Sequence, residues 1–132
     1  VFPLHPRTKN RAEQFGLTKR LESIPNIVLT GPAGYLDFIA LMAESKLVLT
    51  DSGGLQEETT ALGIPCLTLR ENTERPITVT EGSNTIVGNN PQVIIDAAIE
   101  IIENGGKAGR IPELWDGKTA ARIADIIENT IK

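Results

Sequence analysis

Residues 47–58 read Leu-Val-Leu-Thr-Asp-Ser-Gly-Gly-Leu-Gln-Glu-Glu. The apolar run 47–50 predicts a β-strand, and a helical pattern begins at Leu55, so the pair Gly53-Gly54 joins strand to helix. Backbone N–H groups at the start of such a helix have no partner within it, and the positive end of the helix dipole lies behind them. An anion, most often a phosphate, fits this position.

Two interpretations of residues 51–54 follow from the residues alone. In the first, Gly53 and Gly54 let a phosphate approach the backbone because neither has a Cβ, and the Ser52 hydroxyl adds a donor. In the second, Ser52 caps a helix at a tight entry turn. The stretch matches neither GxxxxGK[ST] nor GxGxxG, so no common phosphate-binding motif chooses between them.

The alternation of strand and helix continues along the chain. Strands are predicted where short apolar runs occur, at residues 1–4, 27–30, 47–50, 66–69 and 85–87. Helices are predicted at residues 36–43, 55–62 and 91–104 and after residue 116. The third helix is the best marked, with Asn90 as cap, Pro91 at its first position and Gly105 as its stop. Right-handed crossovers place helices on both sheet faces, so the expected fold is α/β, a three-layer α/β/α Rossmann-like parallel sheet.

Length and composition limit the class of protein. The chain has 132 residues and is 40% apolar, which suits one domain with its own core. Thirteen Lys and Arg against seventeen Asp and Glu give a formal net charge of -4, and the aromatic residues are three Phe, one Tyr and one Trp. An acidic chain with few stacking side chains is poorly suited to nucleic acid. No apolar run approaches the ~20 residues of a membrane span, so we expect neither nucleic-acid nor membrane partners.

Cysteine and histidine each occur once, as Cys66 and His5. A single cysteine cannot form an internal disulfide, and the sequence shows no basic-then-apolar leader, so we expect a cytoplasmic protein. One cysteine and one histidine do not make a metal-ligand cluster, so no metal site is expected. Because the chain begins at Val1 and residues 1–4 already read as a strand, we expect it to be part of a longer protein.

Two further side chains are expected at the carboxyl edge of the sheet, where open parallel sheets bind ligands. Glu58 lies six residues after Ser52, about one and a half helical turns, and a carboxylate there can accept two ribose hydroxyls. Its alternative role is that of a solvated acid near the helix N-terminus. Phe38 follows the second strand, where its ring is available to a base or, alternatively, belongs to the core.

The polar loop 70–76 follows the fourth predicted strand and reaches the same edge. Its Arg75 has the planar donor arrangement that suits diphosphate oxygens. The alternative is a surface ion pair between Arg75 and Glu71 or Glu74.

Three motifs, in this order and spacing, resemble those of non-hydrolysing UDP-N-acetylglucosamine 2-epimerases. They span Gly34 to Phe38, Leu49 to Glu58 and Thr68 to Pro76. The resemblance covers the second of the family's two Rossmann-like lobes, an arrangement shared with glycosyltransferase-B enzymes. It implies that residues 1–132 form the C-terminal UDP-binding Rossmann-like domain and that the N-terminal catalytic lobe lies outside this chain.

The resemblance also implies UDP-N-acetylglucosamine or UDP as the ligand. It assigns the diphosphate to Ser52, Gly53 and Gly54, the ribose to Glu58, the phosphate side to Arg75 and the surroundings of the uracil to Phe38. His5 resembles a histidine that contacts a second, regulatory UDP-N-acetylglucosamine in some bacterial members. The alternative for His5 is a residue at the end of a strand that bonds to nearby backbone.

The family reaction inverts C2 of the sugar without NAD or another cofactor, because UDP is eliminated and then added back across the opposite face. The product from UDP-N-acetylglucosamine is UDP-N-acetylmannosamine. The family's catalytic carboxylates belong to the other lobe, so we expect this chain to bind UDP without epimerising, and the whole protein to be a homodimer. Two alternatives are the donor lobe of a UDP-sugar glycosyltransferase and a UDP-sugar-sensing module without catalysis.

Overall fold

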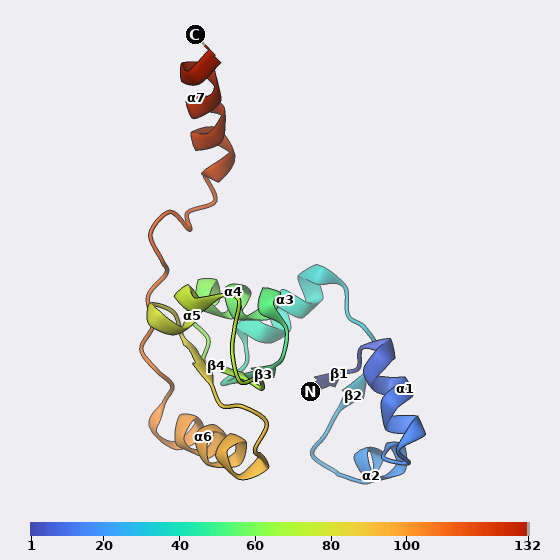
Figure 1. Cartoon of the computed structure of the whole chain (residues 1–132). Helices are drawn as coiled ribbons and strands as arrows, with labels where there is room; N and C mark the ends of the chain where they lie inside the picture. The colour runs from blue at the N-terminus through green and yellow to red at the C-terminus, as the bar shows by residue number, and fades with distance from the viewer. Residues whose placement is uncertain (132) are drawn as a thin grey trace. The chain divides into compact units, whose positions relative to one another are not determined.

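A computed structural model describes residues 1–131 of the chain (Figure 1). The chain divides into two compact units, residues 1–40 and residues 41–132. Strands in both units pair in parallel, which confirms the expected α/β class. The expectation that residues 1–132 make one UDP-binding domain stays a prediction. Within residues 1–131, no helix is both long and apolar enough to cross a membrane.

The first unit is built on a pair of two-residue strands. β1 (Phe2–Pro3) pairs with β2 (Leu29–Thr30), and Leu4 N–H extends the ladder by donating to Thr30 O at 2.9 Å. Between the strands lie α1 (Pro6–Gln14) and α2 (Thr18–Glu22), neither of which the sequence pattern predicts. In α1 the one buried residue is Ala12, so this helix has no apolar stripe to mark it. α3 (Tyr35–Ala43) leads into the second unit.

The second unit contains a three-stranded parallel sheet in the order β3-β4-β5. Its strands are β3 (Val48–Thr50), β4 (Cys66–Thr68) and β5 (Asn84–Ile86). Its helices after β3 are α4 (Gly53–Leu62), α5 (Pro76–Thr80), α6 (Pro91–Asn104) and α7 (Thr119–Ile131). α4 and α5 lie on one side of the sheet and α6 on the other, as the three-layer arrangement predicts (Figure 1). All five strands match the predicted ranges to within two residues, but they form two sheets instead of one.

The buried core of the second unit contains more polar than apolar side chains. Among the described residues of this unit, the buried apolar side chains are Met42, Cys66, Leu67 and Pro112. Burial also raises the pKa of the Cys66 thiol. Buried polar groups need hydrogen-bond partners, so bonds between side chains define this core together with apolar packing. The buried polar residues are Thr50, Gln56, Thr59, Thr60, Thr68, Thr78, Ser83 and Asn84.

Candidate functional site

The junction of β3 and α4 has the strand, turn and helix that the sequence predicts. Ser52 is the N-cap residue, with extended backbone angles (φ -84°, ψ 127°), but its side chain makes no capping hydrogen bond. Its own N–H donates to Thr50 Oγ1 at 3.0 Å. Asn90, in contrast, caps α6 as predicted, because its Oδ1 accepts from Gln92 N–H at 2.9 Å. Ser52 therefore holds the N-cap position, as the second interpretation predicts, but its hydroxyl leaves the first N–H groups of α4 without a side-chain partner.

The fold itself does not require glycine at the start of α4. Neither Gly53 nor Gly54 has a positive φ, the backbone conformation that favours glycine. A Cβ added to Gly53 would lie 3.8 Å from the Glu74 carboxyl group and 3.9 Å from Arg75 Cγ, and one added to Gly54 would lie 3.9 Å from Ser52 Oγ. These are ordinary van der Waals distances. The glycine pair instead leaves backbone that an external group can approach closely.

Arg75 reaches this place from the loop after β4. Its Nε donates to Glu57 Oε1 at 2.9 Å, and its Nη1 donates to Glu74 O at 3.4 Å. The side chains of Arg75 and Glu57 are 43% and 40% exposed, so water screens this ion pair and a stronger acceptor can replace it. The alternative pairing of Arg75 with the Glu71 or Glu74 carboxylate is wrong, because the partner comes from α4.

The Glu74 carboxylate pairs with Arg70 instead, at 3.2 Å from Arg70 Nη1. A hydrogen bond from its own backbone and the charge of Arg70 hold the pKa of Glu74 below its usual range. Glu74 therefore places a carboxylate near Gly53, and Arg70 partly neutralises its charge.

Glu58 lies on α4, half-buried, in the turn after Gly54. It lines a small pocket of about 280 Å³ together with Glu57, Ala61 and Trp115. The structure therefore brings Glu58 to the same helix as the glycine pair and adds Trp115 as a neighbour that the sequence did not indicate. The role of Glu58 in binding ribose stays a prediction.

Phe38 and His5 belong to the first unit, whereas the glycine pair and Arg75 belong to the second. Phe38 is half-buried on α3, and its place near uracil stays a prediction. His5 is the N-cap of α1, where its Nδ1 accepts from Arg7 N–H at 3.2 Å. This bond confirms the interpretation of His5 as a residue that bonds to nearby backbone, and its regulatory role stays a prediction.

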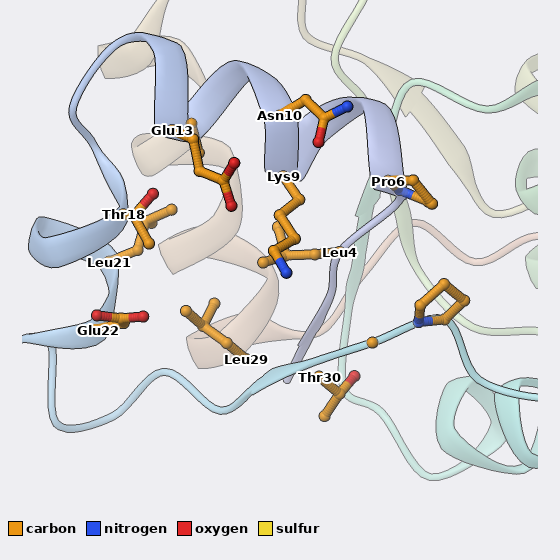
Figure 2. A pocket seen from close by; sticks show the side chains of 13 residues that line it. Leu4, Pro6, Lys9, Asn10, Glu13, Thr18, Leu21, Glu22, Leu29 and Thr30 are labelled. Carbon is orange, nitrogen blue, oxygen red and sulfur yellow. The ribbon is translucent and has the colours of Figure 1, made fainter.

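A larger cavity, about 620 Å³, lies inside the first unit between α1, α2 and β2 (Figure 2). The cavity is lined by the apolar side chains of Leu4 and Leu29 and by the charged side chains of Lys9, Glu13 and Glu22. None of the predicted substrate-binding residues lines it. Carboxylates outnumber cations here as they do around α4, but the helix that starts at this cavity is capped by the His5 side chain, whereas α4 starts at a glycine pair without a side-chain cap, so the start of α4 is the better candidate for a diphosphate.

Sequence reasoning missed the two buried amides beneath the site. Gln56 and Asn84 are both fully buried, and Asn84 Nδ2 donates to Gln56 Oε1 at 3.2 Å. Polar residues of this kind are mostly exposed, which is why neither was expected inside. The available signal was helical spacing, because Gln56 shares a face with Thr59 and Thr60, three and four residues later, and both are also buried.

Comparison with known proteins shows which family the chain resembles in sequence. A family model described as UDP-N-acetylglucosamine 2-epimerase matches residues 1–128. The UDP-N-acetylglucosamine 2-epimerase of Methanocaldococcus jannaschii is 45% identical over 127 residues, which are 96% of this chain and 34% of that protein. The UDP-2,3-diacetamido-2,3-dideoxy-D-glucuronate 2-epimerase of Pseudomonas aeruginosa is 44% identical over 131 residues, which cover 96% of this chain and 34% of that protein.

Solved structures show the same likeness in three dimensions. The crystal structure of the M. jannaschii UDP-GlcNAc 2-epimerase in complex with UDP-GlcNAc and UDP superimposes with a TM-score of 0.81 at 44% identity. The match covers 97% of this chain and 35% of that chain. It confirms the expected fold class, one lobe of a glycosyltransferase-B type protein. The chain thus spans about a third of the length of the relatives that it matches.

Proposed function

The chain belongs to the UDP-N-acetylglucosamine 2-epimerase family, and we propose that it is the UDP-binding part of such an enzyme. The whole enzyme would convert UDP-N-acetylglucosamine to UDP-N-acetylmannosamine by eliminating UDP and adding it back. No NAD is needed on this route, because elimination and re-addition of UDP transfer no hydride.

One observation carries the proposal. Gly53 and Gly54 are the first residues of α4, and the N-cap side chain before them makes no hydrogen bond to the helix. Neither the backbone conformation nor the packing requires glycine at these two positions. A diphosphate explains the pair, because its oxygens need close approach to backbone N–H groups and gain from the helix dipole. Arg75 stands beside the same glycine, where its guanidinium can leave Glu57 for a phosphate oxygen.

The proposed chemical role of this site is to stabilise the leaving group. When the bond between the anomeric carbon and the diphosphate breaks, negative charge grows on the departing oxygen. Donors fixed in place before the reaction, here the N–H groups of α4 and the Arg75 guanidinium, stabilise that charge. The base that removes the C2 proton is expected in the part of the enzyme outside this chain, so residues 1–132 alone are expected to bind UDP and not to epimerise.

The relatives share the nucleotide and differ in the sugar. The M. jannaschii and P. aeruginosa relatives are about equally similar to this chain, and their names give different sugars on the same UDP. The site at α4 would contact the part of the substrate that these two have in common. UDP-N-acetylglucosamine is proposed as the sugar nucleotide because the family model and the M. jannaschii relative carry that name.

The proposal extends to the whole protein in two respects. We propose a homodimer, formed through the part outside this chain, and a cytoplasmic location. Size-exclusion chromatography with light scattering on the longer protein tests the first, and cell fractionation tests the second.

Titration of the chain with UDP tests the function. We expect saturable shifts of the Gly53 and Gly54 amide signals in NMR spectra. Arg75→Ala removes charge-assisted hydrogen bonds worth about 1.5–3 kcal/mol, so UDP should bind roughly ten- to a hundredfold more weakly. Arg110→Ala is the matched control, because the Arg110 side chain is 73% exposed and pairs with Glu81 at 3.1 Å, outside the proposed site. Unchanged UDP affinity in Arg75→Ala, or UDP shifts confined to other residues, would disprove the proposed site.

A further inference from the structure

The fully buried amides of Gln56 and Asn84 connect the helix that begins at the proposed diphosphate site to the sheet. Gln56 is two residues beyond Gly54 on α4, and Asn84 begins β5. Asn84 Nδ2 donates to Gln56 Oε1 at 3.2 Å, and Asn84 Oδ1 accepts from Thr68 Oγ1 at 2.7 Å. The pair therefore joins the helix that starts at the glycines to β4 and β5. Buried amides lose much when a partner moves, which holds Asn84 and the Gln56 oxygen in place, whereas Gln56 Nε2 has no partner among the described residues.

Two threonine hydroxyls connect this amide pair to the backbone of Arg75. Thr73 Oγ1 donates to Gln56 Oε1 at 2.5 Å and accepts from Arg75 N–H at 2.9 Å. Thr78 Oγ1 donates to Arg75 O at 2.7 Å and accepts from Asn84 Nδ2 at 3.0 Å. Both backbone polar groups of Arg75 are thus held by hydroxyls that are themselves anchored in the core.

This backbone clamp, and not the side-chain ion pair, fixes where Arg75 lies. The Arg75–Glu57 pair is exposed on both sides, and such pairs contribute little because water and salt screen them. The bonds that anchor the two threonines to Gln56 and Asn84 are buried or part-buried, the bond from Thr78 to Arg75 O is part-buried, and the bond from Arg75 N–H to Thr73 is exposed. An arginine that must meet phosphate oxygens in one geometry binds better when its position is set before the ligand arrives.

We propose that Thr73, held by Gln56, is a positioning residue that places Arg75 against the diphosphate of UDP. The inference rests on the proposed function, because it gives Thr73 an effect on UDP only through Arg75. Thr73 itself need not touch the nucleotide. It is the member of the clamp best suited to a test, since it is half-buried in a loop, whereas Gln56 and Asn84 are fully buried.

The test compares Thr73→Val, which removes the hydroxyl at nearly constant size, with Thr73→Ser, which keeps it. UDP and uridine are titrated into the 132-residue chain at one salt concentration, and thermal unfolding shows that each variant is folded. We expect Thr73→Val to weaken UDP binding about tenfold, which corresponds to the loss of one hydrogen bond between Arg75 and a phosphate oxygen. Uridine, which has no phosphate, should bind as before. Thr73→Ser should stay within about twofold of the parent chain. If Thr73→Val does not fold, Thr73→Ala is titrated in the same way.

A thermodynamic cycle shows whether Thr73 acts through Arg75. In an Arg75→Ala background, Thr73→Val should have no further effect on UDP affinity. Thr80→Val is the matched control, because Thr80 lies on α5 and its exposed hydroxyl donates to Pro76 O at 3.3 Å, outside the clamp. This variant should bind UDP like the parent chain.

The outcomes separate the two proposals. If Arg75→Ala weakens UDP but Thr73→Val does not, the positioning role is refuted and the proposed function stands. Equal losses for UDP and uridine, or an equal loss in the Arg75→Ala background, also refute the positioning role. If Arg75→Ala leaves UDP affinity unchanged, the assignment of Arg75 to the diphosphate fails, and the inference about Thr73 fails with it.

Discussion

Replacing Gly53 with alanine should separate the stability of the fold from ligand binding. The added Cβ meets the Glu74 carboxyl group at 3.8 Å and Arg75 Cγ at 3.9 Å, so the folded chain accepts it without displacement. Since the φ of Gly53 is not positive, alanine also restricts the unfolded chain at no cost to the folded one. We therefore expect Gly53→Ala to stabilise the fold by about 0.4–1 kcal/mol.

The same methyl group takes the space into which a phosphate oxygen would fit. Loss of one charge-assisted hydrogen bond from a backbone N–H costs about 1.5–3 kcal/mol. This corresponds to a roughly ten- to hundredfold higher Kd for UDP. Urea unfolding measures the first quantity and calorimetric titration with UDP measures the second, both on the same preparation.

Gly63→Ala is the control, with the opposite expected pattern. Gly63 ends α4 in the left-handed conformation, with φ +71° and no atom within 4 Å of an added Cβ. Alanine there is strained by roughly 1–2 kcal/mol, so stability should fall while the Kd for UDP stays the same. The reasoning is refuted if Gly53→Ala binds UDP as tightly as the parent chain, or if it destabilises the fold as much as Gly63→Ala does.

Four other predictions concern the buried groups and the ribose carboxylate. Asn84→Leu removes three side-chain hydrogen bonds and should lower the free energy of unfolding in urea by about 2–4 kcal/mol. Thr60→Val, which removes a buried hydroxyl without a partner among the described residues, should be neutral or stabilising, and similar losses in both variants would contradict this account. Glu58→Gln should weaken UDP more than uracil alone in NMR titrations, and equal effects would exclude a ribose contact. Burial raises the pKa of the Cys66 thiol above its ordinary value of 9.0. Above pH 9 the unfolded chain therefore loses the thiol proton while the folded chain still keeps it. Stability in urea should therefore be intact below pH 9 and fall as the pH rises above it, with a smaller fall in Cys66→Ala.

The local signals in the sequence predict most of the fold. Residues 47–58 specify a strand, a turn and a helix because each signal acts within a few neighbours: an apolar run, two glycines and a helical pattern. Asn90 and Pro91 fix the start of α6 for the same reason. The helices that were missed are polar or short, as in α1 and in α5 with its sequence Pro-Ile-Thr-Val-Thr, and their formation depends on tertiary contacts that no local pattern shows.

The partners of the site residues were not predictable in this way. Glu57 takes Arg75 although Glu71 and Glu74 are nearer in sequence, because the loop after β4 lies against the start of α4.

The polar core shows the same limit of sequence reasoning. Gln56 and Asn84 are 28 residues apart, and their types usually lie at the surface. Residue type and spacing predict the order of strands and helices and the glycine pair between them, because these features depend on conformation within one turn of chain. Which side chains meet in the core, and what therefore holds Arg75, depends on parallel strands that bring distant segments together, and that information exists only once the chain has folded.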